Sequence, residues 1–146
     1  MRLRDILLVE DNTHDVEFTL KAMAKNKLAN KIVVVKDGVE ALEYLRREGK
    51  YKDRETGLPS VVLMDIKMPR MDGIETLGEI RNDEKLKLLP VVMLTSSREE
   101  SDLVTAYKLG VNAFVLKPVE FNEFVEASKI VGMFWGVLNE IPNLKE

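Results

Sequence analysis

The sequence predicts an α/β fold built around one parallel β-sheet. Five short apolar runs alternate with five segments whose apolar residues recur at helical spacing. Short apolar runs bounded by turn signals are typical of strands buried on both faces, and parallel neighbours need crossover connections such as helices. The alternation therefore favours a five-stranded parallel sheet with helices on both faces. No repeat or linker divides the 146 residues, so we expect one domain over 1–146.

The first half of the chain contributes two strands and two helices. Residues 6–9 form an apolar run, and the segment after them has a helical apolar pattern that Asn12 or Thr13 can cap. The β-branched run at 32–35 predicts the second strand. A short amphipathic helix follows, which Gly49 can end.

The second half continues the alternation after a polar segment. Residues 50–60 are polar, rich in charge and broken by Gly57 and Pro59, so we expect an exposed, mobile loop there. The later elements are, in order, a strand at 61–64, a helix running to about residue 81, a strand at 91–94, a helix ending at Gly110, a strand at 113–116 and a helix at about 120–139. The C-terminal tail at 140–146 contains a proline and shows no periodicity.

Composition limits the kinds of function that the chain can have. It contains no cysteine, so disulfides and thiolate chemistry are excluded, and a metal would be bound by oxygen atoms or by the single His14. The lack of cysteine also fits a cytoplasmic protein. We find no signal peptide and no apolar run near the roughly 20 residues of a membrane span. A net charge of −3 gives no reason to expect direct nucleic-acid binding.

Polar and charged side chains stand where the predicted strands end. They are Glu10 and Asp11 after the first strand, Asp65 after the third, Thr95 after the fourth and Lys117 after the fifth. In a flavodoxin-like (βα)5 fold, with strand order 2-1-3-4-5, these groups converge in one crevice at the carboxyl edge of the sheet. We therefore expect the functional site there.

Three of these side chains are carboxylates, which repel one another unless a cation lies between them. Mg²⁺, or Mn²⁺ in its place, suits such a site because it prefers oxygen ligands and also binds phosphate oxygens. We expect Glu10, Asp11 and Asp65 to hold this metal ion. The backbone carbonyl of Lys67 is a further expected ligand.

The arrangement is typical of a carboxylate that attacks phosphorus. Asp65 would be the nucleophile and form an aspartyl phosphate. Lys117 and the hydroxyl of Thr95 would hold the phosphoryl oxygens, so the protein would act by positioning and by neutralising charge. A lone aspartate at a strand end is more commonly a cap or a turn former, and only the groups at the other strand ends favour a nucleophile.

The same residues resemble the receiver domain of two-component response regulators. The resemblance covers residues 5–139 and rests on Glu10-Asp11, Met64-Asp65, Met68-Pro69, Asp72-Gly73, Thr95-Ser96 and Lys117-Pro118, which occur in the family's order. It implies that Asp65 accepts a phosphoryl group from a phosphohistidine of a sensor histidine kinase or of a histidine phosphotransfer protein. It also implies Mg²⁺ dependence and slow self-hydrolysis, so that the protein catalyses only its own phosphorylation and dephosphorylation.

The resemblance assigns further roles to four residues. Thr95 falls on the family's switch hydroxyl and Phe114 on its switch aromatic. Phosphorylation would draw Thr95 inward and let Phe114 rotate into the vacated space, which changes the surface around it. Lys67 and Ser97 fall on positions that flank the path of the hydrolytic water in receivers. We expect them to tune the phosphoryl lifetime, in a direction that does not follow from the sequence.

Three features are similar to the stand-alone regulators that work with bacterial phytochromes. We expect no output domain beyond the receiver, the loop at 50–60 is long, and Glu10-Asp11-Asn12 stands in place of a double aspartate. The resemblance therefore points to a phytochrome-like kinase as the partner. Regulators of this kind tend to form homodimers.

The last helix carries more apolar surface than one buried face requires. Its apolar residues cover most of the circumference: Phe121, Phe124, Val125, Ile130, Val131, Met133, Phe134, Trp135, Val137 and Leu138. We expect a homodimer through this helix. The alternative is that the tail at 141–146 folds back over it.

Three other functions compete with this interpretation. A phosphorylation-independent pseudo-receiver scaffold is opposed by the intact Asp65, Lys117 and Thr95. A Mg²⁺-dependent phosphatase of the haloacid-dehalogenase type needs a second aspartate two residues after its nucleophile, where this chain has Lys67. A nucleotide- or flavin-binding protein is opposed by the lack of a G-x-G-x-x-G motif after the first strand.

Overall fold

Strands and helices alternate along the chain. The computed structural model describes residues 3–96, 98–117 and 120–142. Its elements are β1 (Ile6–Val9), α1 (Thr13–Lys25), β2 (Ile32–Val35), α2 (Gly38–Arg46), the 3-10 helix η1 (Gly49–Tyr51), β3 (Val61–Met64), α3 (Gly73–Asn82), β4 (Val91–Thr95), α4 (Glu100–Lys108), β5 (Ala113–Leu116), α5 (Phe121–Val131) and the π-helix η2 (Gly132–Leu138). Within the described ranges, no helix is long and apolar enough to cross a membrane.

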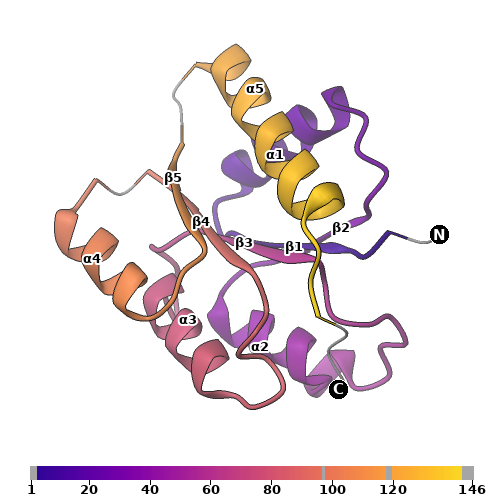
Figure 1. Ribbon diagram of the computed structural model, residues 1–146, viewed down its shortest axis with the longest axis vertical. Helices are drawn as coiled ribbons and strands as arrows, with labels where there is room; N and C mark the ends of the chain where they lie inside the picture. Colours follow the sequence, from indigo (N-terminus) through magenta and orange to yellow (C-terminus); the bar gives the residue numbers. More distant parts are fainter. Residues whose placement is uncertain (1–2, 97, 118–119, 143–146) are drawn as a thin grey trace.

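The five strands form one parallel sheet in the order β2-β1-β3-β4-β5 (Figure 1). The predicted flavodoxin-like topology is confirmed. β1 pairs with both β2 and β3, and Ile6 lies opposite Ile32 and Val61. Because all strands run in the same direction, their carboxyl ends share one edge of the sheet, and the strand order reverses between β1 and β3. The residues that follow β1, β3, β4 and β5 therefore lie at the same edge.

Helices cover both faces of the sheet, as the sequence predicts. α1 and α5 pack against each other on one face, and α2, α3 and α4 lie on the other (Figure 1). The central strands β1, β3 and β4 are buried at every position, which explains their nearly continuous apolar sequences. The edge strand β5 is only partly buried and ends at the exposed Leu116.

The segment from Lys50 to Ser60 is anchored to α2, in contrast to the mobile loop that we expected. The guanidinium of Arg54 donates to the backbone carbonyls of Tyr44 at 3.0 Å and of Gly57 at 2.8 Å, and its central carbon lies 4.5 Å from the centre of the Tyr44 ring. The last residues of the segment are buried. One arginine thus donates hydrogen bonds to backbone carbonyls at the end of α2 and in the loop, and so holds the loop against the helix. The number of charged residues in a segment does not reveal such a contact.

The last helix changes its geometry part of the way along. The predicted helix is present, but α5 continues as the π-helix η2, with wider turns. Gly132 packs against Leu28, at a position where a side chain would collide. The carbonyl of Gly136 accepts a hydrogen bond of 2.9 Å from the buried side chain of Asn30. These two glycines let the end of the helix lie close to the loop before β2.

Candidate functional site

The strand ends meet around the ammonium group of Lys117. Its Nζ contacts a carboxylate oxygen of Glu10 and lies 3.2 Å from Oδ2 of Asp65 and 3.2 Å from Oδ2 of Asp15. The side chains of Glu10, Asp65 and Lys117 are largely buried. The structure therefore brings together three of the predicted site residues, which follow β1, β3 and β5.

Asp65 stands directly after β3 with its carboxylate held in one orientation. Its Oδ1 accepts hydrogen bonds from the Thr95 hydroxyl and from the backbone N–H of Ile66, both at 2.6 Å, while Oδ2 faces Lys117. Burial raises the pKa of Asp65, but the bonds from Thr95, Lys117 and Ile66 together bring it below its usual value. Asp65 is therefore an ionised carboxylate at neutral pH, which is the form that a nucleophile needs.

Glu10 differs from Asp65 because burial dominates its ionisation. Burial raises the pKa of Glu10 to about 7, an effect that outweighs the opposing ion pair with Lys117. For Lys117 the balance is reversed: burial lowers its pKa, but Glu10 and Asp65 raise it above the usual value. Of Glu10, Asp65 and Lys117, Glu10 is therefore the group whose pKa lies near neutral pH.

The donor atoms of the cluster fit a hard divalent cation. Glu10, Asp15 and Asp65 each offer a carboxylate oxygen, and these three atoms all lie within 4.8 Å of one another. Mg²⁺ and Mn²⁺ prefer oxygen ligands of this kind. Lys117 neutralises only part of the charge of three carboxylates, so a divalent cation is the complement that the cluster favours.

We expect divalent cations to bind this cluster more weakly as the pH falls below about 7. Below that pH the Glu10 carboxyl carries a proton, which a cation must displace. The apparent affinity for Mg²⁺ should therefore fall by up to about tenfold for each pH unit, and level off at higher pH. Calorimetric titration with Mg²⁺ over a pH series measures this. The Glu10→Gln protein should bind more weakly with a flatter profile, and equally steep profiles in both proteins would contradict the assignment.

Several predicted residues lie beside the cluster and not within it. Asp11 is exposed, and its carboxylate is not part of the group of three that Asp15 completes. The Lys67 side chain is exposed and its Nζ lies 3.8 Å from a carboxylate oxygen of Glu99. Ser97 lies outside the described residues.

Asp15 is the site residue that our sequence analysis does not include. α1 begins after its N-cap Asn12, whose side chain accepts a hydrogen bond of 3.0 Å from the N–H of Asp15. Because the helix starts so soon after β1, its first turn lies over the strand end that carries Glu10. An acidic residue three positions after a predicted cap was the signal that could have identified Asp15.

The loop after Asp65 is fixed at several points. Gly73 lies so close to the carbonyl oxygen of Asp65 that any side chain there would collide with it. Asp72 caps α3, and Arg70, at a φ of 62°, donates to the buried Asp37 at 2.8 and 3.0 Å. The ion pair joins this loop to the start of α2. The backbone next to Asp65 is thus positioned by contacts on both sides.

Thr95 and Phe114, the predicted switch pair, are both inside or against the core. Thr95 is fully buried, with its hydroxyl on Asp65. Phe114 is partly buried, packs against the main core and lines a cavity of about 320 Å³ together with Leu103 and Leu116. Thr95 thus already points inward onto Asp65, and Phe114 stands beside a cavity at the surface.

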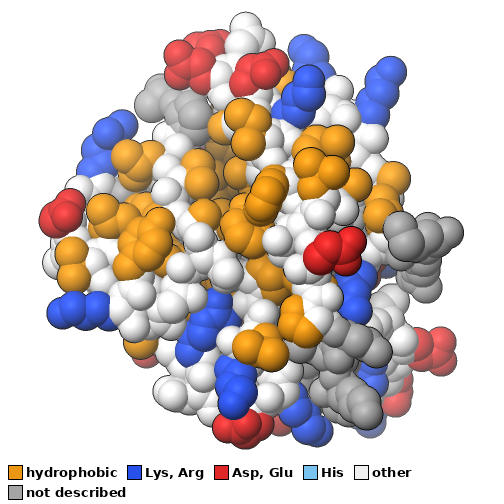
Figure 2. All heavy atoms as spheres, in the orientation of Figure 1, with side chains coloured by type: hydrophobic (Ala, Val, Ile, Leu, Met, Phe, Trp, Pro, Cys, Tyr) orange, Lys and Arg blue, Asp and Glu red, His pale blue; other side chains and the backbone are white. Residues whose placement is uncertain are grey.

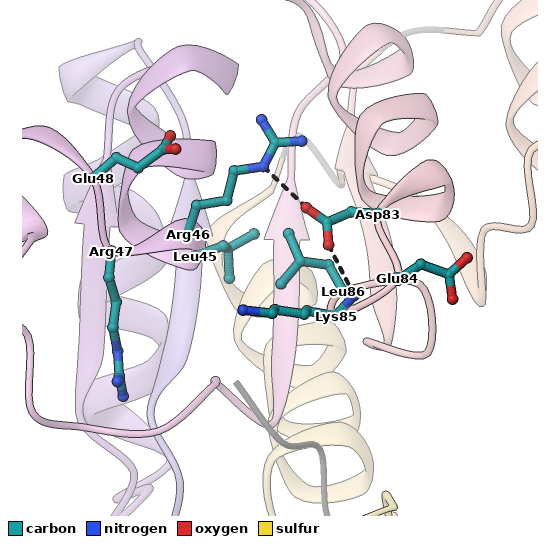
Figure 3. Close-up of a pocket in the computed structure, with 8 residues that line it drawn as sticks. All are labelled: Leu45, Arg46, Arg47, Glu48, Asp83, Glu84, Lys85 and Leu86. Atoms are coloured by element: carbon teal, nitrogen blue, oxygen red, sulfur yellow. Dashed lines mark hydrogen bonds and ion pairs between the residues drawn. The ribbon is translucent and has the colours of Figure 1, made fainter.

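A larger cavity of about 560 Å³ lies away from the cluster, between the end of α2 and the connection that follows α3 (Figure 3). Arg46 donates to Asp83 at 3.1 Å, and Asp83 also accepts from the N–H of Lys85 at 2.9 Å. The charged residues of the lining are balanced: Arg46, Arg47 and Lys85 against Glu48, Asp83 and Glu84. This lining favours no particular ligand, so the carboxylate cluster remains the candidate site.

The chain matches known proteins along most of its length. The family model described as response regulator receiver domain matches residues 6–129. A similar curated protein is the response regulator Rcp1 of Synechocystis sp. It is 31% identical over 130 residues, which cover 89% of this chain and 87% of Rcp1.

Solved structures of similar proteins share the fold. The phosphorylated cyanobacterial phytochrome response regulator RcpA is 35% identical with a TM-score of 0.88, over 97% of this chain and 100% of that one. The Mn²⁺-bound form of Rcp1 is 29% identical with a TM-score of 0.86, over 95% and 99%. The bacteriophytochrome response regulator AtBRR is 56% identical with a TM-score of 0.78, over 96% and 100%.

Proposed function

This chain belongs to the receiver domain family of response regulators, and we propose that its phosphoryl acceptor is Asp65. Acceptance of a phosphoryl group from a kinase is the role of this family, whose members are signalling modules and not turnover enzymes. The observation that supports Asp65 most directly is its buried, ionised carboxylate, held by Thr95 and facing Lys117.

In the proposed reaction, a carboxylate oxygen of Asp65 attacks the phosphorus of a phosphohistidine. An O–P bond forms and the P–N bond breaks, and the imidazole nitrogen keeps the electron pair and takes up a proton from solvent. Lys117 and the Thr95 hydroxyl are placed to hold phosphoryl oxygens. The same residues would support only the protein's own phosphorylation and slow dephosphorylation.

Receiver domains bind Mg²⁺ or Mn²⁺ at an acidic pocket, and the related Rcp1 has a Mn²⁺-bound structure. For this chain we propose Glu10, Asp11 and Asp65 as carboxylate ligands, with the backbone carbonyl of Lys67 as a further one. The cation would neutralise charge on the transferring phosphoryl group. The carboxylate oxygens gathered around Lys117 support Glu10 and Asp65 as ligands, whereas Asp11 lies outside that group.

The direct test is incubation of the protein with acetyl phosphate and Mg²⁺, followed by intact-protein mass spectrometry. We expect one phosphoryl adduct per chain, and none when the cation is removed by a chelator. If neither an adduct nor binding of beryllium fluoride is found, the chain acts as a phosphorylation-independent scaffold.

We propose a sensor histidine kinase of the phytochrome type, or a histidine phosphotransfer protein, as the phosphoryl donor. RcpA and AtBRR, which resemble this chain over nearly its whole length, are described as phytochrome and bacteriophytochrome regulators. The exchange would take place in the cytoplasm, where a kinase obtains its phosphoryl group from ATP. The net charge of −3 supports signalling through another protein and not through direct contact with nucleic acid.

Lys67 is expected to influence how long the phosphoryl group persists. Lys67 follows Asp65 by two residues, and its exposed side chain is paired with Glu99 at 3.8 Å. We expect Lys67→Ala to alter the half-life of the phosphorylated protein, and we propose Ser97 as the second residue on the path of the attacking water. The half-life is measured from the loss of the adduct mass over time. An unchanged half-life in Lys67→Ala would remove this role.

We propose that the protein forms a homodimer through the last helix. Large apolar side chains are exposed on α5 and η2: Ile130, Met133, Phe134, Val137 and Leu138. Figure 2 shows hydrophobic side chains gathered on the face where Figure 1 places β5, with α4 and α5 on either side. Several large exposed apolar side chains near one another are typical of a protein–protein interface. The alternative, a covering tail at 141–146, involves residues that lie mostly outside the described part of the chain.

The Ile130→Glu protein is expected to be a monomer at concentrations where the wild type is a dimer. The side chain is 68% exposed in the single chain, and a carboxylate placed at an apolar interface would have to be buried without a partner. Sedimentation velocity measures the difference. Leu88→Glu, which changes an exposed leucine on the connection after α3, is the matched control and should remain a dimer. A wild type that sediments only as a monomer, phosphorylated or not, would rule out this proposal.

A further inference from the structure

Asp15 has no assigned role, yet it reaches the centre of the candidate site. Its Oδ2 lies 3.2 Å from Nζ of Lys117, and one of its oxygens lies within 4.8 Å of oxygens from Glu10 and Asp65. The hydrogen bond from its N–H to the Asn12 side chain fixes the start of α1, and with it the direction from which Asp15 approaches. Asp15 is therefore held beside the reacting carboxylate by the fold itself.

The spacing of these oxygens suits one shared cation. Two ligand oxygens on opposite sides of a Mg²⁺ ion, each at about 2.1 Å, are about 4.2 Å apart. The three carboxylate oxygens all lie within 4.8 Å of one another, so one ion between them could be reached by all three. The exposed Asp11 lies outside this group, although it follows Glu10 directly in the sequence.

Lys117 alone does not account for the position of Asp15. The ammonium is already paired with the two buried carboxylates of Glu10 and Asp65, whereas the Asp15 side chain is 36% exposed. A third carboxylate at that point adds negative charge that Lys117 leaves uncompensated. A divalent cation removes this excess.

We propose that Asp15 supplies a further carboxylate to the divalent-cation site of this protein. The proposal rests on the proposed function, because it requires that the cluster binds a cation. It assigns to the first turn of α1 a ligand that the sequence motif at the end of β1 does not contain. Asp15 would increase the affinity for the cation and, through it, the fraction of protein ready to accept a phosphoryl group.

Two other roles for Asp15 must be distinguished from this one. The first is stabilisation of the helix dipole by an acidic residue in the first turn of a helix, and the second is that Asp15 only holds Lys117 in place. Asn at position 15 keeps an oxygen that can accept from Lys117, but it removes the charge. The Asp15→Asn change therefore separates a cation ligand from a holder of Lys117.

The experiment measures Mn²⁺ affinity from the electron paramagnetic resonance signal of free Mn²⁺. Asp15→Asn is compared with the wild type and with Glu17→Gln, which removes one exposed carboxylate from the same helix outside the cluster. The comparison is repeated in a Lys117→Met background. We expect Asp15→Asn to weaken Mn²⁺ binding about tenfold or more in both backgrounds, and Glu17→Gln to change it by less than about twofold.

Each outcome decides the proposal. Unchanged Mn²⁺ affinity in Asp15→Asn overturns it and leaves the proposed function intact. Weakening that disappears in the Lys117→Met background also overturns it, because Asp15 would then act through Lys117. A wild type that binds no Mn²⁺ overturns both this proposal and the cation site itself. Circular dichroism of the Asp15→Asn protein shows separately whether the helix is kept.

Discussion

The Asp65→Asn protein is expected to take up no phosphoryl group from acetyl phosphate under conditions that label the wild type completely. An amide oxygen at this position can still accept the hydrogen bonds from Thr95 and from the N–H of Ile66, so the local structure should be kept. The amide has no negative charge and is not a nucleophile toward phosphorus. Intact-protein mass spectrometry should therefore show only the unmodified mass.

Two comparisons make this result specific to Asp65. Glu17→Gln removes an exposed carboxylate that lies outside the cluster, and this protein should be labelled like the wild type. An adduct that persists in Asp65→Asn would place the phosphoryl group on another carboxylate of the cluster, Glu10 or Asp15. That result would contradict the assignment of Asp65 as the acceptor.

The positions of the strands follow from the sequence because the central strands are buried on both faces. Their apolar runs therefore end where the chain leaves the sheet, and the first polar residue marks the carboxyl edge. Glu10 and Asp65 were found in this way, Lys117 follows the apolar run of the edge strand β5, and the parallel topology brings the three together. Thr95, the last residue of β4, was found for the same reason.

The features that the sequence did not predict depend on side chains that reach across the fold. Asp15 joins the cluster because α1 starts directly after β1. The direction of α1 is set by its packing against α5. Arg54 anchors the loop before β3 by donating to backbone carbonyls, which carry no sequence signal. The π-helix η2 begins at Gly132, which lies close to Leu28, and apolar periodicity carries no signal for such a contact.

Lys117→Met is expected to lower the free energy of unfolding by about 3–5 kcal/mol in the absence of divalent cations. The substitution keeps an apolar stem but removes the ammonium, so the nearly buried carboxylates of Glu10 and Asp65 lose their counter-charge. For a domain of this size, such a loss lowers the unfolding temperature by about 10 °C. Lys87→Met is the control, because Lys87 forms only an exposed pair with Glu84 and should contribute little.

The pH dependence of this loss follows from Glu10. Burial raises the pKa of Glu10 to about 7 in the folded state. A carboxyl with a raised folded-state pKa lowers the free energy of unfolding as the pH rises from its unfolded-state pKa to its folded-state pKa. Without Lys117 this cost increases, so the Lys117→Met protein should be closest to the wild type at acidic pH, where Glu10 is protonated. Chemical denaturation at several pH values measures both proteins. A difference that grows toward acidic pH would contradict a charged Lys117–Glu10 pair.

Added Mg²⁺ should reverse part of the loss in Lys117→Met, and by more than it stabilises the wild type. A ligand that binds only the folded state stabilises it in proportion to the logarithm of its concentration over its dissociation constant. In the variant the cation no longer meets the repulsion of the ammonium, and it becomes the counter-charge of Glu10 and Asp65. Mg²⁺ should therefore restore the stability of the Lys117→Met protein but not its phosphorylation, because the ammonium that would hold the phosphoryl oxygens is still missing. A variant that Mg²⁺ stabilises no more than the wild type would mean that lysine and cation do not compete for the same carboxylates.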